Sequence, residues 1–153
     1  MEYPDWSGRV GLVTGASSGI GEAVALTMAD MGMRVAISAR RSERLEALAD
    51  RMEGDVMVLP ADLRKEDQIL SVFESIRARW GGVDVLINNA GLGRIAPLES
   101  GATEDWREMF EVNVLALAIC TREALSDLRT RGDNGHIIHI SSMSAHRVPT
   151  GTG

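Results

Sequence analysis

The chain has 153 residues, a formal net charge of −6, 44% hydrophobic residues and one cysteine, which favours a single domain with a hydrophobic core. The acidic balance argues against partners such as nucleic acid or an anionic membrane, and a lone cysteine, Cys120, excludes an internal disulfide. We expect a cytoplasmic protein, because residues 1–7 carry no targeting signal and the apolar runs are too short to span a bilayer.

Short apolar runs alternate with helical patterns along the chain, without a linker or repeat between them. Periodicity and β-branched residues predict strands over residues 10–14, 34–39, 56–60, 83–88 and 137–141. Helices are predicted over residues 19–31, 42–53, 65–80 and 104–131. Ser42 is the expected N-cap of the second helix, and Thr103 marks the start of the fourth. This alternation predicts an α/β fold with a doubly wound parallel sheet (Rossmann fold), truncated after the fifth strand.

A glycine-rich turn, residues 14–21, follows the first predicted strand directly and leads into a helix. In such a turn Gly15 would allow the sharp bend, Gly19 the close approach of a pyrophosphate, and Gly21 the packing of helix against strand. The helix N-terminus behind the turn also favours an anion. A dinucleotide is therefore the expected ligand, with an ordinary strand-to-helix turn as the alternative. The residues predicted to hold it here are Gly15, Ser17, Ser18, Gly19, Ile20 and Gly21.

The second predicted strand is followed by Arg40 and Arg41, where a carboxylate would otherwise contact the 2′-hydroxyl of an NAD ribose. A guanidinium at this point can pair with a 2′-phosphate, so the sequence favours NADP(H) over NAD(H). The alternative, weighted about evenly, is that both arginines are solvated residues at the start of the next helix.

Two further strand ends carry polar residues, and ligands of α/β sheets bind at the carboxyl ends of the strands. Asp62 and Leu63 follow the third strand, where the carboxylate either lies near the adenine or caps the next helix; both roles could coexist. The segment 88–91, Asn-Asn-Ala-Gly, follows the fourth strand and by itself could be a turn.

The glycine-rich turn, Asp62, segment 88–91, Asn113 and the pair Ser141-Ser142 stand in an order and spacing that closely resemble the short-chain dehydrogenase/reductase superfamily. The resemblance covers essentially the whole chain. It implies an NADP(H)-dependent oxidoreductase that interconverts a carbonyl and a secondary alcohol on a small or medium apolar substrate. Residues 109–117, 120–124, 135–138 and 143–148 narrow the resemblance to a branch that suggests steroid, retinoid or terpenoid alcohols as substrates.

The resemblance also implies residue roles. Besides the turn, the cofactor contacts would be Arg40 and Arg41 for the 2′-phosphate, Asp62 and Leu63 for the adenine, and Asn89, Ala90 and Gly91 for the ribose side. Ser142 would donate a hydrogen bond to the substrate carbonyl oxygen, which gains negative charge as hydride arrives. Asn113 would interrupt its helix and hold a water of the proton relay. Ser142 and Asn113 are thus the expected catalytic residues.

One motif of the superfamily is missing from these residues. Members transfer the proton with a Tyr-x-x-x-Lys motif after the serine, whereas Tyr3 and Lys65 are the only tyrosine and lysine here. Without both groups hydride transfer should be severely slowed. We therefore interpret residues 1–153 as one NADP-binding domain, incomplete at its C-terminus, either part of a longer enzyme or a truncated product whose tail, residues 149–153, is not native. The fifth strand would then be a bare, aggregation-prone sheet edge.

Two functions remain open from the sequence. The leading one is the oxidoreductase, and the alternative is a non-catalytic protein that binds nucleotide or a partner subunit. A methyltransferase fits poorly, because Arg40 stands where such sites normally have an acidic residue. By resemblance, a full-length form would pair through the long helix into a homodimer or homotetramer.

The histidines and the cysteine are assigned to packing or surface positions. His136 and His139 lie on opposite faces of an extended chain, which argues against a shared metal site, and no metal is expected. His146 is expected in an exposed loop. Cys120 lies in an apolar helical stretch, where a buried thiol is common.

Overall fold

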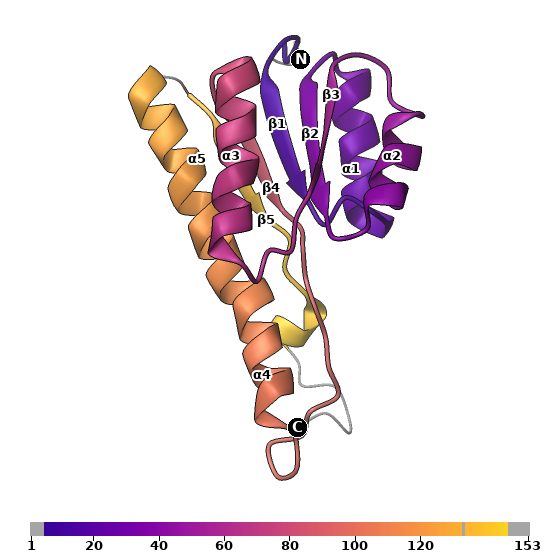
Figure 1. Ribbon diagram of the computed structural model, residues 1–153, viewed down its shortest axis with the longest axis vertical. Coiled ribbons are helices and arrows are strands. Elements are labelled where there is room, and N and C mark those ends of the chain that lie inside the picture. The colour runs from indigo at the N-terminus through magenta and orange to yellow at the C-terminus, as the bar shows by residue number, and fades with distance from the viewer. Residues whose placement is uncertain (1–4, 133, 147–153) are drawn as a thin grey trace.

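A computed structural model describes residues 5–132 and 134–146 of the chain. Five parallel strands form one sheet in the order β3-β2-β1-β4-β5 (Figure 1). The strands are β1 (Val10–Thr14), β2 (Arg34–Ala39), β3 (Val56–Pro60), β4 (Val85–Asn88) and β5 (His136–His139). The helices are α1 (Gly19–Asp30), α2 (Ser42–Ala49), α3 (Glu66–Trp80), α4 (Thr103–Phe110) and α5 (Leu117–Arg131). The predicted doubly wound parallel sheet is confirmed.

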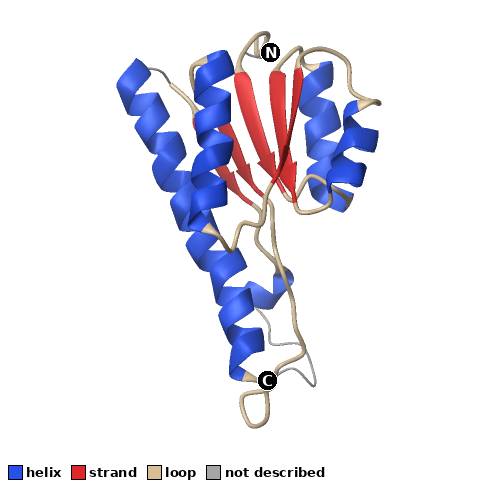
Figure 2. Cartoon of the chain, viewed as in Figure 1, coloured by secondary structure: helices blue, strands red, loops and turns tan. Residues whose placement is uncertain are grey.

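Helices cover both faces of this sheet, as Figure 2 shows. One buried cluster lies under α3 and α5 and includes Leu12, Phe73 and Cys120. The other lies under α1 and α2 and includes Val13 and Leu45. Neighbouring residues of β1 therefore point into different clusters, which explains why the central strand is apolar on both faces.

The elements differ from the prediction mainly at their ends. Ser42 is the first residue of α2 and not its cap; the N-cap position is Arg41, so that prediction was wrong. The fourth strand begins at Val85 instead of residue 83, because the Val83 N–H donates to the Asp127 carboxylate of α5, 3.0 Å away, and not to a neighbouring strand. Side chains distant in sequence thus set these boundaries.

The long helix predicted over residues 104–131 is continuous but not uniform. Between α4 and α5 lies a π-helical segment, η1 (Glu111–Ala116), with Asn113 at its centre. The expected interruption at Asn113 is therefore confirmed, and π-helical segments of this kind often occur at functional sites. The N-terminal part of the helix extends beyond the carboxyl edge of the sheet (Figure 2).

Cys120 packs inside the fold, 1% exposed, and burial raises the pKa of its thiol to about 12. Its expected packing role is confirmed. Among the helices of the described ranges, none has the length and apolar character to cross a bilayer. Tyr3 and the tail over residues 149–153 lie outside the described residues.

β5 forms an edge of the sheet and pairs only with β4 among the described strands. Its Ile138 side chain is 46% exposed. The chain then turns into a short 3-10 segment, η2 (Met143–Ala145). The expected apolar sheet edge is thus present in the described part of the chain.

Candidate functional site

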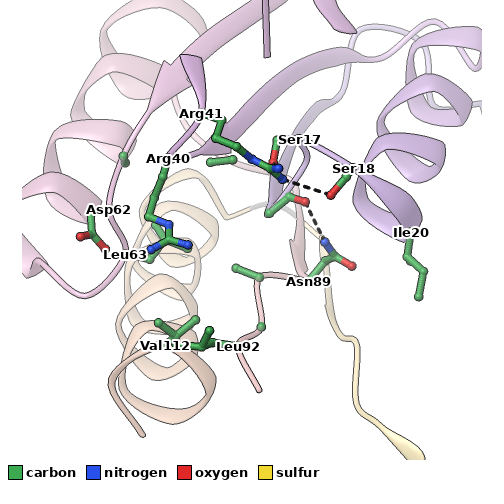
Figure 3. Close-up of a pocket in the computed structure, with 15 residues that line it drawn as sticks. Ser17, Ser18, Ile20, Arg40, Arg41, Asp62, Leu63, Asn89, Leu92 and Val112 are labelled. Carbon is green, nitrogen blue, oxygen red and sulfur yellow. Dashed lines mark hydrogen bonds between the residues drawn. The ribbon is translucent and has the colours of Figure 1, made fainter. Parts of the chain in front are cut away.

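A cavity of about 350 Å³ opens where the carboxyl ends of β1 to β4 meet. Figure 3 shows its lining side chains. All the predicted cofactor residues except Gly19 and Gly21 line it, namely Gly15, Ser17, Ser18, Ile20, Arg40, Arg41, Asp62, Leu63, Asn89, Ala90 and Gly91. The volume falls in the range typical of ligand pockets. Four separate segments of the sequence therefore meet at one concave site.

Sequence reasoning missed four lining residues, Ala39, Ala61, Leu92 and Val112. Ala39 and Ala61 lie directly beside residues that were predicted, so their positions at strand ends were a usable signal. Leu92 and Val112 come from the loop after β4 and from η1, where no local pattern marks a ligand contact.

The glycines of the turn after β1 serve distinct purposes. Gly15 has a φ of +66°, and a Cβ there would lie 2.8 Å from the Ala90 Cα. A Cβ on Gly21 would lie 2.4 Å from the Asn89 amide nitrogen. Gly19 has a φ of +62° and faces open space. Gly15 and Gly21 thus allow close packing, while Gly19 leaves room for an approaching group.

Thr14 and Asn89 fasten this turn to the end of β4. The buried Thr14 Oγ1 accepts hydrogen bonds from the backbone N–H groups of Asn89 (3.0 Å) and Ala90 (3.1 Å). In return, the Asn89 amide donates to the carbonyl oxygens of Thr14 (3.0 Å) and Gly15 (3.2 Å). Asn89 therefore uses its amide to shape the wall of the cavity.

The two arginines after β2 behave differently. Arg41 donates hydrogen bonds to the hydroxyls of Ser17 (2.9 Å) and Ser18 (3.3 Å) and so links α2 to the glycine-rich turn (Figure 3). The guanidinium of Arg40 lies among the residues that line the cavity (Figure 3), and it makes no hydrogen bond or ion pair with a described residue. Its donors are thus available to an anionic group.

Asp62 is engaged by a neighbouring guanidinium. Its carboxylate accepts hydrogen bonds from Arg64 Nε and Nη2, at 3.0 and 2.6 Å, and from the Arg64 backbone N–H at 3.1 Å. The side-chain hydrogen bond from Arg64 holds the pKa of Asp62 below its usual value. The N-cap of α3 is Lys65, so Asp62 closes the turn before the helix and does not cap it.

Arg64 also pairs with Glu108 of α4, which accepts two further hydrogen bonds from Arg94, at 3.1 and 2.7 Å. The hydrogen bonds from Arg94 hold the pKa of Glu108 below its usual value. This chain of ion pairs joins the loop after β3 to the loop after β4 across the start of the long helix. Nothing in the local sequence indicated it.

Asn113 uses both atoms of its side-chain amide on one partner. Its oxygen accepts from the Leu92 N–H and its nitrogen donates to the Leu92 carbonyl, each at 2.8 Å. The side chain therefore fixes the loop after β4, and it keeps one N–H and one oxygen lone pair for a further partner such as a water of a proton relay. This refines the role that the family resemblance implied.

Ser142 lies after β5, on the neighbouring strand end, and does not line the cavity. It is exposed and precedes η2, and its Oγ accepts a hydrogen bond from the Ser144 N–H at 3.2 Å. Because this bond occupies a lone pair of the oxygen, the hydroxyl proton of Ser142 is free to be donated to another group.

The histidines occupy the surface. His136 contacts the ring of Trp6, with centroids 5.3 Å apart, and His146 is exposed beside η2. In residues 5–132 and 134–146 no cluster of three or more potential ligands could hold a metal ion. His139 has polar partners, which are described below.

A family model described as short chain dehydrogenase matches residues 9–152. The chain is 50% identical over 149 residues to dehydrogenase/reductase SDR family member 11 of Gallus gallus, covering 94% of this chain and 58% of that protein. It is 40% identical over 150 residues to farnesol dehydrogenase of Aedes aegypti, covering 94% and 60%. The predicted resemblance to this branch of the superfamily is confirmed.

Among solved structures, a metagenomic short-chain oxidoreductase in complex with NADP has a TM-score of 0.91 and 34% sequence identity. The match covers 98% of this chain and 69% of that one. The chain spans about three-fifths of the length of the curated relatives it matches.

Proposed function

This chain belongs to the short-chain dehydrogenase/reductase family, and from that premise we propose that it binds NADP(H) and serves the interconversion of a carbonyl and a secondary alcohol on a small or medium apolar substrate. The observation that carries the proposal is the guanidinium of Arg40, which has no hydrogen-bond or ion-pair partner among the described residues and lies in the lining of a cavity that also holds the glycine-rich turn. Such a group suits the 2′-phosphate that distinguishes NADP(H) from NAD(H).

Three features of the cavity support a dinucleotide ligand. The pyrophosphate would lie over Gly19, where the backbone faces open space at the N-terminus of α1. Arg40 would hold the 2′-phosphate, with Arg41 keeping Ser17 and Ser18 in place. The adenine would lie near Leu63, and Asp62 would contact it only with the oxygen lone pairs that Arg64 leaves free.

The ribose next to the nicotinamide would lie along Asn89, Ala90 and Gly91. When bound, the nicotinamide supplies or accepts the hydride. Ser142 would then donate its free hydroxyl proton as a hydrogen bond to the substrate oxygen. A fixed donor at this atom stabilises the transition state more than the ground state, because negative charge grows on the oxygen during reduction.

The test is turnover by the full gene product. Steroid, retinoid and terpenoid alcohols are offered with NADP⁺, and their carbonyl counterparts with NADPH, while absorbance of the reduced nicotinamide is followed. We expect turnover, and Ser142→Ala should lower kcat by about 10²- to 10³-fold, the usual loss for a hydrogen-bond donor to a developing oxyanion. Ser144→Ala is the matched control, because only its backbone N–H contacts Ser142.

Two outcomes would contradict the proposal. Absence of binding to either nicotinamide nucleotide would remove its basis. Binding of NADPH without turnover of any offered substrate would favour the alternative, a non-catalytic protein that binds nucleotide or a partner subunit.

The same proposal includes the compartment and the oligomeric state: we propose that the full-length protein is cytoplasmic and forms a homodimer or homotetramer. Support for self-association comes from the long helix, where Phe110 is 63% exposed and Val114 and Leu115 are about half exposed. Such an apolar surface is typical of interaction sites.

A further inference from the structure

The side-chain amide of Asn88 lies where β4, β5 and α5 meet. Its nitrogen is 3.1 Å from Thr121 Oγ1 on α5 and 3.1 Å from His139 Nδ1 on β5. Asn88 is 4% exposed, whereas the His139 ring lies at the surface. Neither the cofactor contacts nor the role of Ser142 described above account for these two contacts.

The hydrogen-bond pattern fixes the direction of each bond. The Thr121 hydroxyl has a single proton, which it donates to the Leu117 carbonyl oxygen 2.7 Å away. Thr121 Oγ1 must therefore accept from Asn88, so the amino group of the amide faces it. The second amino hydrogen then points to His139 Nδ1, and this contact is a hydrogen bond in the tautomer that carries its proton on Nε2.

The backbone connects this amide to the candidate catalytic serine. The Asn88 carbonyl oxygen accepts a hydrogen bond from the Ile140 N–H at 2.9 Å, two residues before Ser142. On the other side, the next residue, Asn89, holds the carbonyl oxygens of the glycine-rich turn. Asn88 therefore stands between the cofactor turn and the serine, and it holds β5 with both its side chain and its backbone.

We propose that His139 is a positioning residue. Its neutral ring accepts a hydrogen bond from Asn88 and thereby sets the position of Ser142 relative to the wall of the cofactor cavity. The inference rests on the proposed function, because the place of Ser142 matters for turnover only if Ser142 contacts the substrate. The His139 side chain on the edge strand β5 would then have a functional role.

Protonation of His139 breaks this arrangement. A proton on Nδ1 would face the amino group of Asn88, donor against donor. Turning the amide over would bring its oxygen to Thr121, whose proton is already donated to Leu117. The charged groups that share the groove of His139 are Arg122 and Arg129 of α5, and its described lining contains no carboxylate that would offset the new charge. On β5 the other titratable group is His136.

The first test is the pH profile of kcat in the full gene product. We expect kcat of the wild type to fall on the order of tenfold in acid that protonates His139. His139→Asn should keep the activity and lose this fall, since an asparagine oxygen accepts from Asn88 and does not titrate. His139→Leu should lower kcat at every pH.

Two variants serve as matched controls. His136→Asn changes the other histidine of β5, which contacts Trp6, and His146→Asn changes the one four residues after Ser142. Both should keep the acidic fall in kcat. If the fall persists in His139→Asn, or disappears in a control instead, the inference is overturned.

The second test does not depend on turnover. Nitrogen NMR shifts of His139 should show Nε2 protonated and Nδ1 bare at neutral pH, and the backbone amide shift of Ser142 should follow the titration of His139. The inference is overturned if Nδ1 is protonated, or if the backbone amide shift of Ser142 does not change as His139 titrates. If the gene product turns over no substrate, the proposed function fails. These NMR shifts alone then decide whether the hydrogen bonds of Asn88 with Thr121 and His139 exist.

Discussion

At the scale of single residues, Arg40 and Arg41 show how adjacent identical side chains take separate tasks. Arg41 donates to the serines of the glycine-rich turn, which holds the turn against α2. Arg40 makes no hydrogen bond or ion pair with a described residue and lies among the lining of the cavity. A guanidinium without an internal partner retains its capacity to bind a phosphate.

We expect Arg40→Asp to weaken NADPH binding at least about tenfold and to leave NADH binding nearly unchanged, because only NADPH carries the 2′-phosphate. Titration calorimetry with both nucleotides measures the two affinities. Arg44→Asp is the matched control: it makes the same change in net charge on the exposed surface of α2, away from the cavity. Equal losses in the two variants would refute the phosphate contact.

At the scale of elements, the site depends on a junction between the ends of β1 and β4. Thr14 closes β1, and its hydroxyl oxygen accepts from two backbone N–H groups that follow β4 while its proton goes to the Ile87 carbonyl at 3.2 Å. One buried hydroxyl thus joins two parallel strands at the edge where the ligand would bind. The glycine-rich turn begins at the next residue.

Thr14→Val keeps the shape of this side chain and removes its hydroxyl. Each of the two N–H groups left without an acceptor costs about 1–3 kcal/mol, so we expect a loss of about 2–6 kcal/mol in the free energy of unfolding, measured by urea denaturation. Thr27→Val, on the exposed face of α1, removes a hydroxyl that bonds only within its helix and should change this free energy by less than about 0.5 kcal/mol. Similar losses in both variants would show that the junction does not stabilise the fold.

At the scale of the whole molecule, the sheet of the described chain has two unequal edges. α2 packs on β3 at one edge, whereas β5 at the other carries the exposed Ile138. Unpaired backbone groups next to apolar side chains favour pairing with another chain. The 153-residue chain is therefore expected to self-associate through β5.

Ile138→Lys should reduce this association, because a charge on an edge strand opposes sheet extension. Light scattering of the 153-residue chain across a concentration series measures the effect. Ile95→Lys is the control, since Ile95 is 82% exposed on a loop away from the edge. An equal gain in solubility from both variants would mean that charge alone, and not the edge, is responsible.

The sequence predicted the elements well where local pattern decides them. The bounds of β1, β2 and β3 agree with the apolar runs, and the helices follow in the predicted order. The prediction failed where a distant side chain intervenes: Val83 leaves the fourth strand because Asp127 takes its N–H. The same holds for the site. The sequence predicted most lining residues at strand ends, but it did not predict Leu92 and Val112.

The sequence by itself determined the family, the order of strands and helices along the chain and the set of strand ends that surround the cavity, because glycine spacing and apolar periodicity are local properties of the chain. Only the tertiary structure decided which polar groups remain available there. Asp62 is engaged by Arg64, Asn113 by Leu92 and His139 by Asn88, while Arg40 has no partner in the described part of the chain. Hydrogen bonds such as Asn113–Leu92 and His139–Asn88 depend on distances between residues far apart in the sequence, which no local pattern encodes.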